Sequence, residues 1–156
     1  MSKRSIENMF THHGKTVDVI GKTRVKTYHD LYNYLTELQN SKEISVHDNY
    51  LGDNVLAINI YKKKYLIKDL SCDHIEKTPE DVFKRLGSFL STVEGTKAKQ
   101  KKWARKFYEE LFEGRFIPGG RVLAGAGDLY RLKTLANCFV TKIQKDEIDS
   151  IYKAAY

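Results

Sequence analysis

Two amphipathic segments in tandem, residues 78–94 and 97–113, constrain the fold of this chain more than any other feature. At the start of the first, Thr78 precedes Pro79, and Asp81 stands three residues after the threonine. This is the pattern of a capped helix start with proline in the first turn. Apolar side chains then recur at helical spacing at Val82, Phe83, Leu86, Phe89, Leu90 and Val93.

The second segment is bounded by two glycines, Gly95 and Gly114. Each glycine is predicted to end the preceding helix as a left-handed stop. The apolar face of the second helix consists of Trp103, Ala104, Phe107, Tyr108, Leu111 and Phe112. Trp103 is interpreted as a core residue. The short connection favours antiparallel packing of the two helices through their aromatic faces.

The preceding part of the chain has weaker patterns. Residues 16–26 alternate in polarity and predict a small hairpin. Residues 28–39 predict a helix with Thr27 as its N-cap. Its apolar face is formed by Tyr28, Leu31, Leu35 and Leu38. Residues 50–70 favour a short helix capped by Asp53, although their β-branched side chains also suit a strand.

The sequence changes character at residue 115. Residues 115–128, RFIPGGRVLAGAGD, contain five glycines or prolines, which predicts that no regular helix forms there. Residues 138–143, CFVTKI, predict a buried strand, and residues 146–155 predict a helix with an acidic first turn. The expected fold is therefore mainly α with a small β part.

Composition excludes several classes of protein. No apolar run approaches the length that spans a bilayer, and the N-terminus lacks the apolar core of a signal peptide, so we expect a soluble cytoplasmic protein with no membrane partner. The chain has 27 basic and 20 acidic residues, a net charge of +7. Its two cysteines, Cys72 and Cys138, lack the spacing of a zinc site or a disulfide scaffold.

Two features are candidates for chemistry. The backbone at Gly119, Gly120 and Arg121 can approach a phosphate closely, but a tight structural loop explains the same glycines, and neither a P-loop nor a dinucleotide fingerprint is present. Cys138 suits either a buried structural cysteine or a redox thiol at a strand end. Cys72 lies in a polar turn and is interpreted as a free, inert thiol.

The order of motifs carries a family resemblance. Three segments, NVLAINIYKKKYLIKD at 54–69, RFIPGGRVLAGAG at 115–127 and TLANCFV at 134–140, resemble the N-terminal part of a ribonucleotide reductase large chain. They are most similar to the adenosylcobalamin-dependent (class II) enzymes, over about residues 49–155. The resemblance implies a helical N-terminal domain over residues 49–114. Residues 115–156 would then lead into the first strand of the family's α/β barrel, incomplete here, and residues 1–48 would remain a poorly defined segment.

The resemblance also assigns roles to single residues. Cys138 matches the first of two redox cysteines, which together reduce the ribonucleotide substrate and end as a disulfide. Asn137 matches the substrate-contacting residue beside that cysteine. Gly119, Gly120 and Arg121 match the loop that binds the nucleotide near its ribose and phosphates.

Other parts of such an enzyme are expected outside this chain. They include the second redox cysteine, a thiyl-radical cysteine and the regions that bind adenosylcobalamin. We therefore expect the isolated chain to be inactive and to need the C-terminal remainder of the reductase, either as a separate chain or after splicing, unless the chain is a truncated remnant. A thioredoxin-like reductant and a homodimer of the complete enzyme are further implied partners.

A second hypothesis is a small basic nucleic-acid-binding module without catalysis. It is motivated by the net charge, by the aromatic residues and by the lysine-rich run over residues 97–106, which is otherwise a solvated helix face. This hypothesis predicts salt-dependent binding to single-stranded nucleic acid. The motifs PGGRVLAGAG and NCF distinguish the two hypotheses, since a generic basic module has no reason to contain them.

Overall fold

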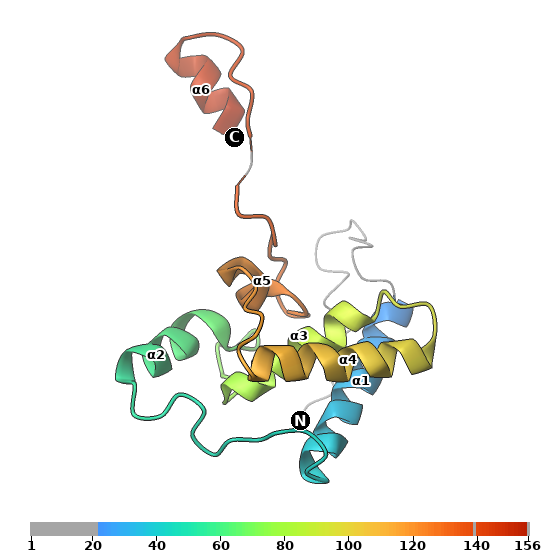
Figure 1. Ribbon diagram of the computed structural model, residues 1–156. Helices are drawn as coiled ribbons and strands as arrows, with labels where there is room; N and C mark the ends of the chain where they lie inside the picture. The colour runs from blue at the N-terminus through green and yellow to red at the C-terminus, as the bar shows by residue number, and fades with distance from the viewer. Residues whose placement is uncertain (1–21, 139, 156) are drawn as a thin grey trace.

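The computed structural model describes residues 22–138 and 140–155, and the regular secondary structure in these two ranges is helical (Figure 1). They contain no strand, and their β pairing is limited to an isolated antiparallel bridge between Lys68 and His74. The elements in chain order are α1 (Lys22–Asn40), α2 (Val55–Ile60), the π-helix η2 (Tyr61–Tyr65), α3 (Pro79–Ser91), α4 (Lys97–Phe112), α5 (Gly120–Gly125) and α6 (Ile148–Ala155).

The core lies where α1 and α4 pack on α3, and Figure 1 shows α3 and α4 side by side. The predicted apolar face of α1 is confirmed: Tyr28, Leu31, Leu35 and Leu38 are buried, and Val25 extends the face by one turn. The core-facing residues of the other two helices are Val82, Phe83, Leu86, Phe89, Ala104, Tyr108 and Leu111. Complete burial of such side chains contributes about 1.5–3 kcal/mol each, so this core is what holds the domain together.

The predicted antiparallel packing of α3 on α4 is confirmed. A Cβ atom placed on Gly87 would lie 2.8 Å from the carbonyl oxygen of Ala104, so only glycine permits this close approach. Further along, Tyr50 packs edge-on against both Phe83 and Phe112, which places the start of α3 beside the end of α4. The interpretation of Trp103 as a core residue is wrong, because its side chain is only half-buried on the outer side of α4.

The helix ends agree with the sequence patterns in part. Thr78 and Asp81 form the predicted capping box at the start of α3. Gly114 adopts a φ of +68° after α4, as predicted for a left-handed stop. The stop predicted at Gly95 is wrong, because α3 already ends at Ser91, where the backbone amide of Thr92 donates to the carbonyl of Phe89.

The N-terminal predictions need correction. α1 already includes Lys22, so the residues from 22 to 26 that were assigned to a hairpin are helical, whereas residues 16–21 lie outside the described residues. Thr27 does not cap the helix. It lies within α1, and its hydroxyl donates to the carbonyl of Thr23 at 2.9 Å.

The segment over residues 50–70 contains a helix, as favoured, but this helix starts one residue later than predicted. Asn54 rather than Asp53 is the N-cap of α2, and its side-chain oxygen accepts a hydrogen bond from the amide of Ala57 at 3.0 Å. The helix then widens into η2, a geometry that is rare and that often marks a functional region.

The C-terminal part differs most from expectation. A short helix, α5, forms inside the glycine-rich stretch that was predicted to lack one. The strand predicted over residues 138–143 is wrong, since the described residues of that range have no strand partner and their side chains are exposed. The predicted C-terminal helix is present as α6, beyond an extended segment that leads away from α5 (Figure 1). Among the described residues, no helix has the length and apolarity needed to cross a membrane.

Candidate functional site

The start of α5 presents backbone amides without a side-chain cap. Gly119 is the N-cap, with φ −55° and ψ 148°, and it has no side chain that could accept a hydrogen bond. Its carbonyl accepts the amides of Val122 at 2.9 Å and Leu123 at 3.1 Å. The first N–H groups of a helix have no acceptor within the helix, so those of α5 are available to an acceptor on a ligand.

Two side chains from distant segments flank this helix start. A Cβ atom placed on Gly119 would lie 3.8 Å from Nδ2 of Asn137. A Cβ atom placed on Gly120 would lie 3.4 Å from the hydroxyl of Tyr65, at the end of η2. The structure therefore brings the predicted residues Gly119, Gly120 and Asn137 together and adds Tyr65, which the sequence analysis missed.

The other two predicted residues are exposed beside this group. Arg121 lies in the first turn of α5, and its side chain is exposed. Cys138 follows Asn137 in the chain, and its thiol is free and exposed, so the interpretation of a buried structural cysteine is wrong. Cys72 is also free and exposed, in a turn where it adopts a φ of +68°.

The glycines of this region differ in what requires a glycine at each position. Gly127 has a φ of +78°, and a Cβ atom there would lie 2.9 Å from Cγ of Arg85. Conformation and packing both require glycine at that position. Gly119 and Gly120 have ordinary backbone conformations, and added Cβ atoms would meet neighbours only at ordinary contact distances. Packing within the chain therefore does not explain these two glycines.

A buried arginine holds α5 in place. The guanidinium of Arg85 pairs with Glu76 at 2.7 Å, and both side chains are at least 95% buried. It also donates to the carbonyl of Leu123 at 2.8 Å, to that of Tyr65 at 3.2 Å and to that of Ala126. We call these five residues the Arg85 cluster. It fixes η2 and α5 to the same side chain of α3.

The sequence contained a signal for this cluster. Arg85 occupies the apolar face of α3, between Val82 and Phe89 at helical spacing. A buried charge requires a partner, so an arginine in that position predicts a buried acid and several carbonyl acceptors. Glu76, whose carboxylate also accepts the amide of Ile67 at 2.8 Å, is that acid.

The segment after α5 is tied down by two further cations. The ammonium of Lys133 lies 2.8 Å from Oδ2 of the buried Asp128 and donates to the carbonyl of Ala124 at 2.9 Å. Arg131 donates to the carbonyl of Asp69 at 2.8 Å. These contacts fix the chain up to Lys133, a few residues before Asn137 and Cys138.

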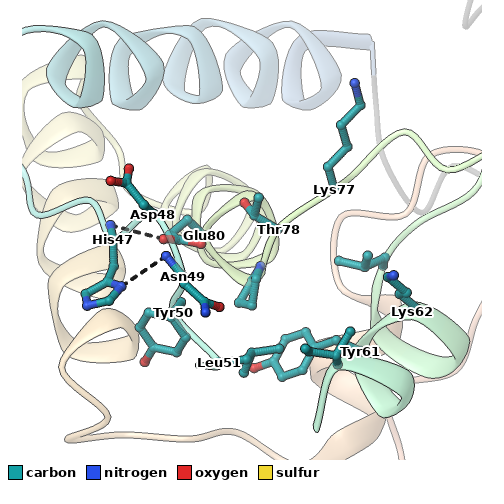
Figure 2. Close-up of a pocket in the computed structure, with 13 residues that line it drawn as sticks. His47, Asp48, Asn49, Tyr50, Leu51, Tyr61, Lys62, Lys77, Thr78 and Glu80 are labelled. Carbon is teal, nitrogen blue, oxygen red and sulfur yellow. Dashed lines mark hydrogen bonds between the residues drawn. The ribbon is translucent and has the colours of Figure 1, made fainter. Parts of the chain in front are cut away.

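A cavity of about 150 Å³ lies elsewhere, between residues 47–51, η2 and the start of α3 (Figure 2). The buried carboxylate of Glu80 borders it and accepts the backbone amide of His47 at 3.3 Å. The aromatic ring of Tyr61 forms another part of its lining. Burial raises the pKa of Tyr61 to about 12, so its hydroxyl stays protonated at neutral pH. None of the predicted site residues lines this cavity.

The described residues contain no group of three or more histidine, cysteine or acidic side chains that could hold a metal ion. The arrangement at α5 is instead suited to an anionic ligand with hydroxyl groups. Backbone amides and an arginine can bind its negative charge, an amide and a phenol can bind its hydroxyls, and a cysteine follows the asparagine in the chain.

Comparison with known families gives one match. Residues 51–131, just over half of the chain, match the model of the family described as the ribonucleotide reductase all-alpha domain. The match spans α2 to α5 and includes the Arg85 cluster, Gly119, Gly120 and Arg121, whereas Asn137 and Cys138 lie beyond it. Comparisons with curated proteins and with solved structures found no match.

Proposed function

The chain belongs to the ribonucleotide reductase all-alpha domain family, and on this premise we propose that it forms the N-terminal part of a ribonucleotide reductase large chain that supplies a nucleotide-binding loop and one redox thiol. The observation that carries the proposal is that the matched residues build the helical body on which Gly119, Gly120 and Arg121 are held. The all-helical body agrees with the family description.

In the proposed binding mode, the amides at the start of α5 and the guanidinium of Arg121 bind the phosphates of the ribonucleotide. The side chain of Asn137 hydrogen-bonds a ribose hydroxyl. Gly119 and Gly120 support this role because no contact within the chain requires glycine there. A ligand that approaches the backbone closely would require a residue without a side chain.

The proposed chemistry of Cys138 is that of one half of a dithiol. Reduction replaces the 2′-hydroxyl of the ribose by hydrogen, and the hydroxyl leaves as water. Two thiols together give up two electrons and two protons and become a disulfide, which balances the reaction. Cys138 would supply one thiol, in keeping with its exposure, and the second thiol would come from another part of the enzyme.

The remaining parts of the proposal rest on the resemblance. The radical that starts the reaction would come from adenosylcobalamin, held by regions outside this chain, and none of this chain's residues is assigned to it. A further polypeptide would complete the α/β barrel, a thioredoxin-like protein would reduce the disulfide, and the complete enzyme would form a homodimer.

Complementation tests the proposal. The chain is mixed with a polypeptide that carries the remaining barrel of an adenosylcobalamin-dependent reductase, and deoxyribonucleotide formation is measured with the cofactor present. We expect activity only from the mixture. Cys138→Ser should abolish turnover, whereas Cys72→Ser, which removes the other exposed thiol, should leave it unchanged. Turnover that survives Cys138→Ser would exclude the redox role of this thiol.

A further inference from the structure

The outward side of α4 combines lysines with aromatic rings. Lys99, Lys102 and Lys106 are exposed, and Trp103 and Phe107 between them are half-buried. Their spacing of three and four residues places them on one face of the helix, which we call the α4 stripe. The core-facing side of α4 is a different face, so the aromatic rings of the stripe are not there to fill the core.

The two rings of the stripe form a pair. The ring centroids of Trp103 and Phe107 lie 5.4 Å apart, and the ring planes are inclined by 32°. The ammonium of Lys106 lies 5.1 Å from the centroid of the indole ring. A flat ligand that stacks on Trp103 would displace this flexible lysine, which could then bind a negative charge on the same ligand.

The charges of α4 are also unusual for a helix start. The first turn of α4 contains lysines and no acidic residue, whereas the first turn of α3 contains Glu80 and Asp81. A helix N-terminus carries positive partial charge, so lysines there repel it and an anion is favoured. Such a local conflict is expected where a partner binds.

We propose that the α4 stripe binds single-stranded nucleic acid, with phosphates on the lysines and bases stacked on Trp103 and Phe107. The combination of lysines and aromatic rings on one face favours single-stranded nucleic acid over an acidic peptide or a membrane. An acidic peptide would use the lysines but not the ring pair, and an amphipathic membrane helix separates its apolar and basic residues onto opposite faces. Single strands offer phosphates and unpaired ring faces together.

The test uses the fluorescence of Trp103, which is the only tryptophan of the chain. Oligothymidylate of about 12 nucleotides, within the site size of single-strand binding proteins, is titrated into the full chain at about 50 mM salt and above. We expect quenching of the fluorescence and an affinity that falls steeply with salt. Lys99, Lys102 and Lys106 are then changed together to glutamine. The matched control changes Lys62, Lys63 and Lys64, exposed on η2, which alters the net charge equally.

We expect the stripe variant to bind at least about tenfold more weakly, with a salt slope smaller by about 2, since each phosphate contact on a single strand contributes about 0.7. The control variant should retain its affinity and quenching. The proposal is overturned by absence of quenching at low salt, or by equal weakening in both variants, which would indicate diffuse charge. It is also overturned if vesicles of anionic phospholipid shift the Trp103 emission while oligothymidylate does not.

Discussion

Replacing Arg85 by methionine removes the charged centre of the Arg85 cluster while keeping a long side chain in its place. The substitution leaves the carboxylate of Glu76 buried opposite an apolar group, with the amide of Ile67 as its remaining partner. It also takes the guanidinium from the carbonyls of Tyr65, Leu123 and Ala126. The variant therefore loses an ion pair and three hydrogen bonds at a site that is almost fully buried.

The expected loss is large. Removal of one partner of a buried ion pair costs about 3–5 kcal/mol of unfolding free energy, since the other charge is left without compensation. A single domain has a total stability of about 5–15 kcal/mol, so Arg85→Met should lose about a fifth of it or more. For a domain of this size the unfolding temperature should fall by about 6–20 °C.

Urea unfolding followed by Trp103 fluorescence and by circular dichroism measures this loss. Arg105→Met is a matched control, because Arg105 pairs with Glu109 at 2.8 Å, nearly the same distance, but both partners are about 40% exposed. An exposed pair contributes less than about 1 kcal/mol, since water screens it. We expect the two arginine variants to differ by at least 2 kcal/mol, which is about the gap between these two ranges.

Glu76→Gln separates the two parts of the cluster. Glutamine keeps the shape of the acid, and Arg85 retains its three carbonyl acceptors, so this variant should lose less stability than Arg85→Met. The reasoning is refuted if Arg85→Met loses less than about 1 kcal/mol, or no more than Arg105→Met. It is also refuted if Glu76→Gln is the more damaging change, since the carbonyl contacts would then contribute nothing.

Three further substitutions and reagents test other features. Gly87→Ala should cost about 1–3 kcal/mol by forcing α3 and α4 apart, measured by thermal unfolding. Asp81→Asn should flatten the loss of stability in acid. Burial raises the pKa of Asp81, but the amide hydrogen bonds and Lys84 outweigh it, so the pKa lies below its usual value. Its contribution is present above about pH 4 and is lost as the pH falls through the native pKa. Cys72 is exposed in the structure, so it should react with a thiol reagent in the folded chain as Cys138 should, although its sequence context predicts an inert thiol.

Each of these has a clear contrary result. Gly95→Ala is the control for the helix contact, because an added Cβ atom there meets nothing within 4 Å, and equal costs for the two glycines would contradict the packing argument. If the loss of stability below about pH 4 is the same in Asp81→Asn as in the unmodified chain, the capping box does not hold the carboxylate of Asp81 ionised. A thiol that reacts only after unfolding would contradict its exposure.

The local parts of the fold were predictable from the sequence because each has a local cause. The capping box at Thr78, the apolar face of α1 and the stop at Gly114 depend on neighbouring residues alone. Trp103 was misassigned because the side of a helix that faces the core is set by its neighbours, and both faces of α4 contain aromatic residues. Helix α5 was missed because its glycine-rich composition predicts a loop. Tertiary hydrogen bonds from Arg85 to the carbonyls of Leu123 and Ala126 hold the helix instead.

The candidate site was predictable only in part for a similar reason. The sequence motifs indicated Gly119, Gly120, Arg121, Asn137 and Cys138, and the structure brings the two glycines and the asparagine together. Tyr65 lies far from them in the chain, and its position depends on the turn of η2. No local pattern records such a contact. The roles of these residues in catalysis stay predictions.

The candidate site has two parts that differ in the free energy of local unfolding: helix α5, which the Arg85 cluster holds, and the segment with Asn137 and Cys138. Opening of helix α5 would expose a buried cation, so its hydrogen-bonded amides, those of Val122 and Leu123, should exchange with solvent only through extensive unfolding. Asn137 and Cys138 have exposed side chains beyond the last tether at Lys133, so their amides should exchange through small local openings. The loop at Gly119 and Gly120 is thus held rigidly, while the segment with Asn137 and Cys138 can be repositioned at little cost by a polypeptide that packs against it.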